Sequence, residues 1–161
     1  MNHFFIHDTP IGELVLEANL DYLIKISFKN KVINQFKTDS KNKKNRIIEK
    51  TVEQLDDYFF NNRTFFTINY ILTTTSFFRK VLEEVSLIEF GKVKSYKQIA
   101  TLIKNKNAYR AVANANANNP LPIIIGCHRV IKSSGKIGGY GGGVINKRYL
   151  LSLENKIGDF H

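Results

Sequence analysis

The segment that holds the only cysteine of the chain reads Asn119-Pro120-Leu121-Pro122-Ile123-Ile124-Ile125-Gly126-Cys127-His128-Arg129-Val130-Ile131. Its apolar, β-branched run predicts a buried strand that ends at Gly126, with the Cys127 thiol directly after it. His128 and Arg129 can both stabilise a thiolate. His128 can do so only if Gly126 breaks the strand, because neighbouring strand residues face opposite ways. A lone buried cysteine is more often a small core side chain. A structural and a nucleophilic Cys127 are therefore both open interpretations here.

The next segment, from Ser133 to Gly143, is rich in glycine. It matches neither a phosphate-binding loop nor a dinucleotide fingerprint, so we expect no nucleotide cofactor. Glycines instead let the backbone approach a flat ligand closely. A final helix is expected over 147–155, and on spacing alone its Glu154 is an ordinary exposed residue.

Three helices are predicted before residue 119. The first has an apolar stripe over 78–85, with Ser76 or a neighbouring threonine as its cap. The second begins at Ser95 to Gln98, which has the spacing of a capping box. A polar turn at 105–107 leads into the third, over 108–117. Two short helices separated by a tight turn predict a helix-turn-helix.

The third helix is unusual because alanine recurs along it and Arg110 is its only charge. A helix that recognises major-groove edges normally carries several long polar side chains. The alanines favour close approach instead, as in a narrow minor groove, with Arg110 free to enter the base stack. The alternative, which these residues leave open, is that the alanines pack on another helix and Arg110 is an ordinary surface charge.

The N-terminal half predicts a small α/β domain without evident chemistry. The predicted elements are strands over 14–18 and 24–28, an exposed basic connection over 29–46, an amphipathic helix over 47–60 and a strand over 66–70. The predicted fold class is α+β. An N-terminal α/β domain spans 1–74, and a mainly helical domain containing the helix-turn-helix spans 75–161.

Charge is unevenly distributed along the chain. The net charge is +10, yet residues 1–89 hold 12 basic and 12 acidic side chains, whereas 90–153 hold 11 Lys or Arg and no Asp or Glu. Such a basic half suits docking on phosphates, although a solubilising surface is the alternative. A single cysteine excludes an internal disulfide and a cysteine-rich zinc site. Without an apolar run long enough to span a membrane, we expect a cytoplasmic protein with no membrane partner.

Six sets of residues together resemble one family. They are Thr9-Pro10-Ile11-Gly12-x-Leu14, Gly91-x-Val93-x-Ser95-Tyr96, Arg110-Ala111-Val112 with Asn119-Pro120, Pro122 to Ile131 around Cys127-His128-Arg129-Val130, Gly139-Tyr140-x-Gly142-Gly143, and Lys147-x-x-x-Leu151-x-x-Glu154. The chain is identified from them as similar to the O6-alkylguanine-DNA alkyltransferases. The likeness covers nearly the whole chain and is strongest from about residue 76 to residue 154.

The resemblance implies the catalytic roles. Cys127 is the alkyl acceptor, and His128, oriented by Glu154, draws off the thiol proton through a water. Tyr96 donates a hydrogen bond to the guanine ring and helps to protonate the leaving base. Asn119 holds the turn beside the active site. A thiolate is the side chain best suited to attack a saturated carbon.

The resemblance also implies the partner, which is double-stranded DNA containing alkylated guanine, bound by a monomer without cofactor or metal. Arg110 fills the gap left when the target nucleotide swings out of the duplex. The DNA-binding residues expected around it are Ala111, Ala115, Ser95 and Lys97. The Val130 carbonyl and the Tyr140–Gly141 backbone contact the guanine.

Two positions depart from the family pattern. Gly126 stands where proline is usual, and Ala113 replaces a glycine common in the recognition helix. Neither touches a reacting atom, so they bear on rate and substrate range. The alternatives are a non-enzymatic alkyl-lesion-binding protein, which Cys127 disfavours, a sequence-specific helix-turn-helix regulator, and a Cys-His hydrolase.

Overall fold

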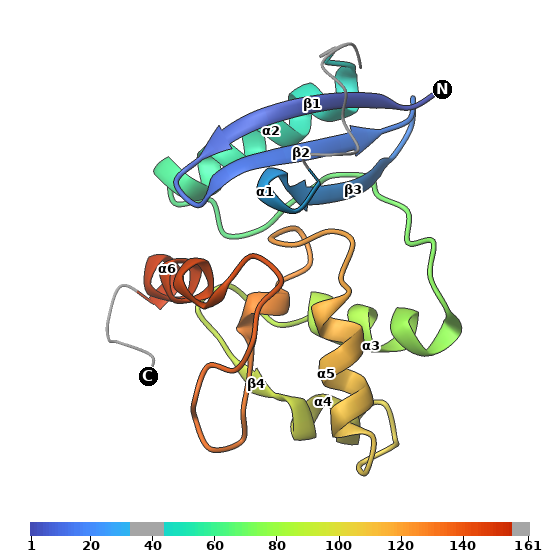
Figure 1. Ribbon diagram of the computed structural model, residues 1–161, viewed down its shortest axis with the longest axis vertical. Coiled ribbons are helices and arrows are strands. Elements are labelled where there is room, and N and C mark those ends of the chain that lie inside the picture. The colour runs from blue at the N-terminus through green and yellow to red at the C-terminus, as the bar shows by residue number, and fades with distance from the viewer. Residues whose placement is uncertain (33–43, 156–161) are drawn as a thin grey trace. The chain divides into compact units, whose positions relative to one another are not determined.

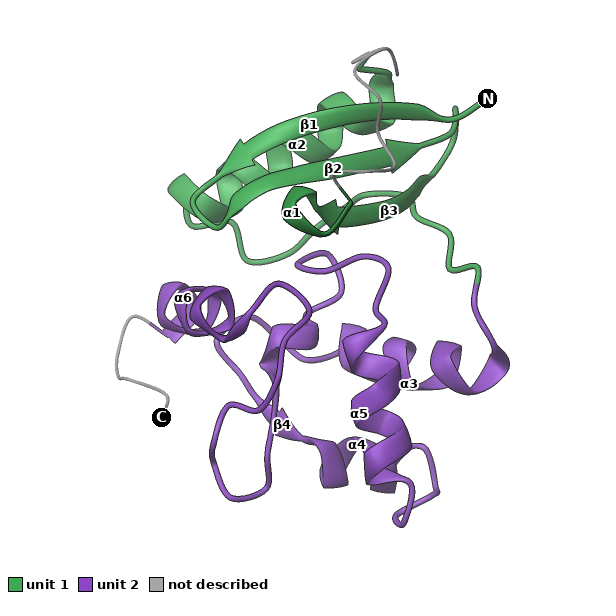
Figure 2. Ribbon diagram, viewed as in Figure 1, with its two compact units in different colours: residues 1–73 green, residues 74–161 purple. Residues whose placement is uncertain are grey.

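The computed structural model describes residues 1–32 and 44–155 (Figure 1). The chain divides into two compact units, residues 1–73 and 74–161 (Figure 2). The first unit combines a sheet with a long helix, and the second is mainly helical, so the predicted α+β fold class is confirmed. No helix of the described segments is long and apolar enough to cross a membrane.

The first unit is built on an antiparallel sheet of three strands, β1 (His3–Thr9), β2 (Gly12–Ala18) and β3 (Leu23–Phe28), in the order β1-β2-β3. Helix α2 (Arg46–Phe60) packs against this sheet (Figure 1). Leu14 and Leu16 of the central strand pair with Phe28 and Ile26, and all four side chains are buried. The alternation predicted for β2 and β3 therefore identifies the core face correctly.

Three expectations for the first unit need correction. Strand β1 and the short helix α1 (Lys29–Val32) were not predicted. Residues 66–70 form no strand: a single bridge joins Tyr70 to Leu23, and the Thr67 N–H and carbonyl bind side chains of α2, those of Gln54 and Lys50. Of the connection expected over 29–46, α1 takes the first four residues, α2 begins at Arg46, and 33–43 lie outside the described residues.

The second unit contains the predicted helix-turn-helix. Helix α3 (Ser76–Ser86) is capped by Thr75, whose side chain accepts from the Phe78 N–H. Helix α4 (Tyr96–Leu102) has both hydrogen bonds of the Ser95–Gln98 capping box. Helix α5 (Tyr109–Ala117) follows after residues 103–108 and packs on both α3 and α4. All three predicted helices are present and the predicted caps of α3 and α4 are confirmed, whereas α5 has no side-chain cap.

The prediction of a buried strand before Cys127 is wrong. Residues 121–126 form turns, with Ile123 in the left-handed region at φ 73°, and Cys127–Arg129 form the 3-10 helix η1. Only the next two residues, β5 (Val130–Ile131), extend, and they pair in parallel with β4 (Lys94–Ser95). The prolines at 120 and 122 lack the N–H groups that a strand ladder requires. As a result, the thiol and the His128 imidazole lie on one turn of η1.

Candidate active site

Cys127 is the first residue of η1, and it is 4% exposed. The turn before it is held by Asn119, whose amide donates to the Ile125 carbonyl at 2.9 Å and whose oxygen accepts from the Leu121 N–H at 3.0 Å. Asn116, buried in α5, donates to the Cys127 carbonyl at 3.0 Å. The thiol is thus fixed by side chains on both flanks of its own turn.

Burial raises the pKa of the Cys127 thiol. A hydrogen bond from Asn119 and the positive charge of Lys147 offset part of that rise. The thiol is therefore protonated at neutral pH and needs a base before it can act as a nucleophile.

A buried carboxylate lies next to this turn. Glu154 of α6 (Val144–Asn155) accepts from His128 Nε2 at 2.7 Å and from Arg129 through Nη2 at 2.8 Å and Nε at 2.9 Å. The Gly91 N–H adds a longer contact at 3.3 Å. Glu154 is 5% exposed, whereas its spacing alone suggested an ordinary exposed residue. Spacing along α6 does not reveal which side of the helix faces the partner loop.

The charges of this cluster set the protonation of His128. His128 and Arg129 hold the pKa of Glu154 far below its usual range, against the effect of burial. Burial lowers the pKa of His128, so the imidazole is neutral at pH 7. A carboxylate can only accept, so the His128 proton lies on Nε2 and Nδ1 keeps its lone pair. Nδ1 has no hydrogen-bond partner within the described part of the chain, and it is therefore available as a base.

Arg129, considered above as a partner of the thiolate, makes its hydrogen bonds to other groups. Its three donor nitrogens bind the Glu154 carboxylate and the Ile88 carbonyl, the latter at 2.7 Å. Lys147 supplies the nearby positive charge instead. In the sequence it belongs to the basic half and to the motif Lys147-x-x-x-Leu151-x-x-Glu154, and neither pattern gives it a role of its own. It is 0% exposed, and its ammonium donates to the Val130 carbonyl at 2.6 Å and the Gly139 carbonyl at 3.1 Å. Burial lowers the pKa of Lys147 to about 8.

Tyr96 and the glycine-rich loop form the other side of the site. Burial and the nearby Cys127 raise the pKa of Tyr96, so its hydroxyl is a hydrogen-bond donor at neutral pH. Gly138 has φ +73°, and a Cβ there would lie 3.0 Å from the Tyr96 hydroxyl oxygen. Glycine is therefore required for the loop to approach Tyr96 so closely. Tyr140, whose pKa burial raises well above its ordinary value, and Gly141 follow in the same loop, both half-buried.

Helix α5 presents one face to solvent and buries the other. Arg110 and Ala111 are exposed, whereas Ala115 is 0% exposed and packs inward with Val112 and Asn116. The expectation that Ala115 contacts DNA is therefore wrong, because its side chain lies in the protein core. The alternative that the alanines pack on another helix is correct for this one residue.

A hollow of about 300 Å³ lies beside the start of α5. It is lined by Tyr96, Lys97, Tyr109, Arg110, Ala113, Lys132 and Ser133. Lys97 is exposed and its ammonium is 5.5 Å from the centre of the Tyr109 ring. Ser95, by contrast, is half-buried, and its hydroxyl oxygen caps α4. The hollow thus brings cationic side chains and two aromatic rings together at the surface.

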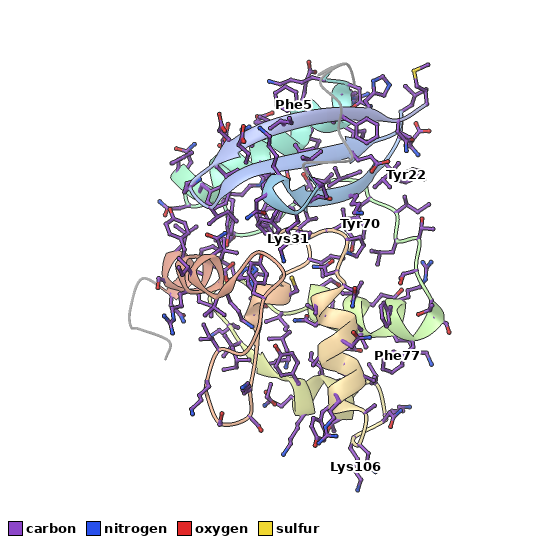
Figure 3. The ribbon with its side chains drawn as sticks, in the orientation of Figure 1. Phe5, Tyr22, Lys31, Tyr70, Phe77 and Lys106 are labelled. Carbon is purple, nitrogen blue, oxygen red and sulfur yellow. The ribbon has the colours of Figure 1, made fainter. Side chains whose placement is uncertain are left out.

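The basic half of the sequence is not all surface. Arg129 and Lys147 are buried, and the other nine of its basic side chains are exposed or partly exposed. Figure 3 shows one of them, Lys106, at the turn between α4 and α5. The exposed positive charge is therefore smaller than the sequence count suggests, because two of the eleven cations are buried and bind partners inside the protein.

Comparisons with known proteins agree on one family. Residues 76–156 match the model described as the 6-O-methylguanine DNA methyltransferase DNA-binding domain, and residues 3–70 match that of its ribonuclease-like domain. The methylated-DNA–protein-cysteine methyltransferase of Mycobacterium tuberculosis H37Rv is 37% identical over 96% of this chain and 93% of its own. The constitutive enzyme of that name from Bacillus subtilis is 31% identical over 96% of each chain.

A solved structure gives the same result. The crystal structure of Mycobacterium tuberculosis OGT in complex with DNA matches with a TM-score of 0.85 and 36% identity, over 96% of this chain and 93% of that one. The two family models, the sequence relatives and the solved structure therefore agree on the same family. The chain belongs to the 6-O-methylguanine DNA methyltransferase family, the methylated-DNA–protein-cysteine methyltransferases, which repair DNA by alkyl transfer.

Proposed function

We propose that this DNA-repair enzyme transfers the alkyl group of O6-alkylguanine irreversibly to Cys127. One observation carries the assignment: a transfer to a protein cysteine needs an acceptor, and the chain has one cysteine. That cysteine lies on the same turn as a neutral, carboxylate-bound histidine. Because a thioether is stable and no second thiol exists to release the alkyl group, each molecule acts once.

His128 is the base of the proposed reaction. The buried thiol is protonated, and His128 Nδ1 carries a lone pair. We infer that Nδ1 takes up the thiol proton through a bridging water, while Glu154 stabilises the imidazolium that forms. Arg129 keeps Glu154 ionised and aligned for this purpose.

The thiolate then attacks the alkyl carbon. The S–C bond forms as the C–O6 bond breaks, the electron pair stays with guanine, and guanine takes up one proton in place of the alkyl group. Guaninate is a poor leaving group, so a donor to the ring lowers the barrier. Tyr96 suits this role, because its raised pKa keeps the hydroxyl protonated at the edge of the site.

The base pocket is proposed to form from backbone on two sides. The Val130 carbonyl, held by Lys147, and the Tyr140–Gly141 backbone would contact the flat guanine ring. Asn119 keeps the preceding turn in place. Close packing of the glycine-rich loop on Tyr96 supports a pocket that is narrow enough for a planar base.

The substrate proposed is double-stranded DNA, with α5 in the minor groove. Flipping the damaged nucleotide costs a few kcal/mol. Arg110 is exposed at the start of α5, where it can fill the gap, and Ala111 beside it allows close approach. Lys97, exposed beside Tyr109, would contact a phosphate, and Ser95 would support this side chain by capping α4. We further propose that the protein works as a monomer, in the cytoplasm with its DNA.

Intact-protein mass spectrometry tests the proposal. The protein is incubated with a duplex containing O6-methylguanine, with Cys127→Ser as the matched control. The expected result is a single added methylene unit in the wild type and none in the variant, without further addition at longer times. An unmodified wild type that still bound the damaged duplex would replace this function with non-enzymatic lesion binding.

A further inference from the structure

The hollow beside the start of α5 has features that the proposed alkyl transfer does not use. Two aromatic side chains, Tyr96 and Tyr109, line it, and three cations, Lys97, Arg110 and Lys132, line it as well. Binding sites for small ligands begin at a volume of about 300 Å³, which is the volume of this hollow. It is therefore large enough for one planar ring with its attached groups, and too small for a segment of duplex.

Tyr109, the first residue of α5, is the more open of the two aromatic side chains. It is 37% exposed, whereas Tyr96 is half-buried. The Lys97 ammonium lies 5.5 Å from the centre of the Tyr109 ring, and the guanidinium carbon of Arg110 lies 5.9 Å from it. A cation within about 6 Å of a ring centre is attracted by the negative ring face. Tyr109 thus offers an accessible ring that is flanked by positive charge.

The charge around this ring is of one sign. None of the described side chains that line the hollow is acidic, and residues 90–153 contain no Asp or Glu. Lys97 of α4 and Lys132, in the turn after β5, are both exposed. An open aromatic ring between exposed cations is how proteins hold a single nucleic-acid strand, because bases stack on the ring and phosphates bind the cations.

Stacking energy decides which base the hollow can take. A base stacked on an aromatic side chain gains about 1–3 kcal/mol, whereas extruding a paired base from a duplex costs a few kcal/mol. A second extrusion beside the target would therefore not be offset by Tyr109 alone. A base that is already unpaired carries no such cost. The hollow is thus suited to single-stranded DNA.

The hollow also adjoins the candidate active site. Tyr96 lines the hollow, and its hydroxyl oxygen would lie 3.0 Å from a Cβ at Gly138, in the glycine-rich loop of that site. Arg110, the proposed gap-filling residue, lines the hollow too. A strand whose target base enters the site beside Tyr96 therefore brings a neighbouring nucleotide to the hollow.

We propose that the hollow is a second nucleotide-binding site, in which an unpaired base next to the target stacks on Tyr109. A phosphate of the same strand is held by Lys97 and Lys132. The proposal rests on the proposed function for the identity of the target base. It adds a single-stranded segment beside the lesion to the DNA that this protein recognises.

Equilibrium binding of a short, undamaged oligonucleotide tests the stack, since every base has a face that can stack. Fluorescence anisotropy follows its binding as a single strand and as a duplex. Tyr109→Leu should weaken single-strand binding by about fivefold or more, the equivalent of one lost stack, and duplex binding by less than about twofold. Tyr109→Phe keeps the ring and should bind the single strand as the wild type does. Tyr22→Leu, at an exposed tyrosine of the first unit, is the matched control and should change neither affinity.

Salt dependence tests the phosphate contacts. Each contact to a phosphate of a single strand contributes about 0.7 to the slope of log affinity against log salt concentration. Lys97→Gln and Lys132→Gln should each make the slope shallower by about that amount. Lys25→Gln, at an exposed lysine of β3, removes the same charge outside the hollow and should leave the slope unchanged.

Three outcomes would overturn the inference. They are equal effects of Tyr109→Leu on single strand and duplex, equal losses for Tyr109→Leu and Tyr109→Phe, and a salt slope that neither lysine substitution alters. Should thermal melting show that Tyr109→Leu is unfolded, photocrosslinking of the wild type to a single strand carrying iodouracil replaces it. A crosslink at Tyr109 supports the stack, and crosslinks confined to other residues overturn it. A wild type that is never methylated at Cys127 instead contradicts the proposed function and leaves these binding results standing.

Discussion

Replacing Glu154 by glutamine tests the charged cluster behind the thiol. The carboxylate accepts from His128, from two nitrogens of Arg129 and, at longer range, from the Gly91 N–H. Glutamine keeps one acceptor oxygen and turns an NH2 group toward the remaining donors. The substitution is nearly equal in volume, so its effects report charge and hydrogen bonding rather than packing.

The structure sets the magnitude for Glu154→Gln. The substitution leaves the buried Arg129 without its counter-charge, and breaking a buried ion pair in this way lowers the free energy of unfolding by about 3–5 kcal/mol. The pKa of Glu154 is lowered in the folded protein, so its contribution is complete above the usual value of 4.5 and is lost as the pH falls below it. The wild type and the variant should therefore converge in stability in acid.

Transfer should also slow. Glu154 raises the pKa of His128, so without it the imidazole becomes a weaker base. General bases contribute about 10²–10⁴ in rate, and we expect a loss of about 100-fold for Glu154→Gln at pH 7. Arg129 then also places an unbalanced positive charge beside the imidazole, which opposes its protonation further.

Urea denaturation and single-turnover transfer measure the two effects. The matched control is Glu83→Gln, an exposed residue of α3, whose unfolding free energy should stay within about 0.5 kcal/mol of the wild type. If Glu154→Gln kept its rate within about threefold and its unfolding free energy within about 1 kcal/mol, the cluster would have neither of the roles assigned to it.

Three further predictions use other residues of the site. Arg110→Ala should slow repair of an O6-methylguanine duplex more than reaction with the free base, measured as rate constants on both substrates, and equal losses would exclude the gap-filling role. Tyr96→Phe should slow transfer at least about tenfold while duplex affinity stays nearly unchanged, and a collapse of binding would make the hydroxyl structural. Lys147 has a pKa of about 8 in the folded protein against an ordinary 10.5, so the folded protein loses this proton first as the pH rises. The free energy of unfolding should therefore increase by up to about 3 kcal/mol between pH 8 and pH 10.5. Lys147→Met should lack this gain in denaturation series at matched pH, and an equal gain in both proteins would contradict the assignment.

Cys127 and Glu154 differ in how well neighbouring residues in the sequence predict their surroundings. The Cys127-His128-Arg129 motif and the Ser95–Gln98 cap are contiguous patterns, so the thiol, its histidine and the helix start could be read from the chain. Glu154, 26 positions after His128, comes within hydrogen-bond distance of it only because α6 packs on η1. Its role came from the family resemblance, because helical spacing alone made it a surface residue.

Sequence by itself therefore determined the family, the α+β class, the helix-turn-helix and the single possible acceptor, since these depend on periodicity, caps and residue type. Tertiary structure alone decided that Ala115 faces inward, that Lys147 is buried and that Arg129 binds Glu154. It also replaced the predicted strand by a turn and a 3-10 helix. The physical reason is that burial and pairing depend on which elements meet in space, and side chains distant in sequence supply the partners that make a buried charge stable.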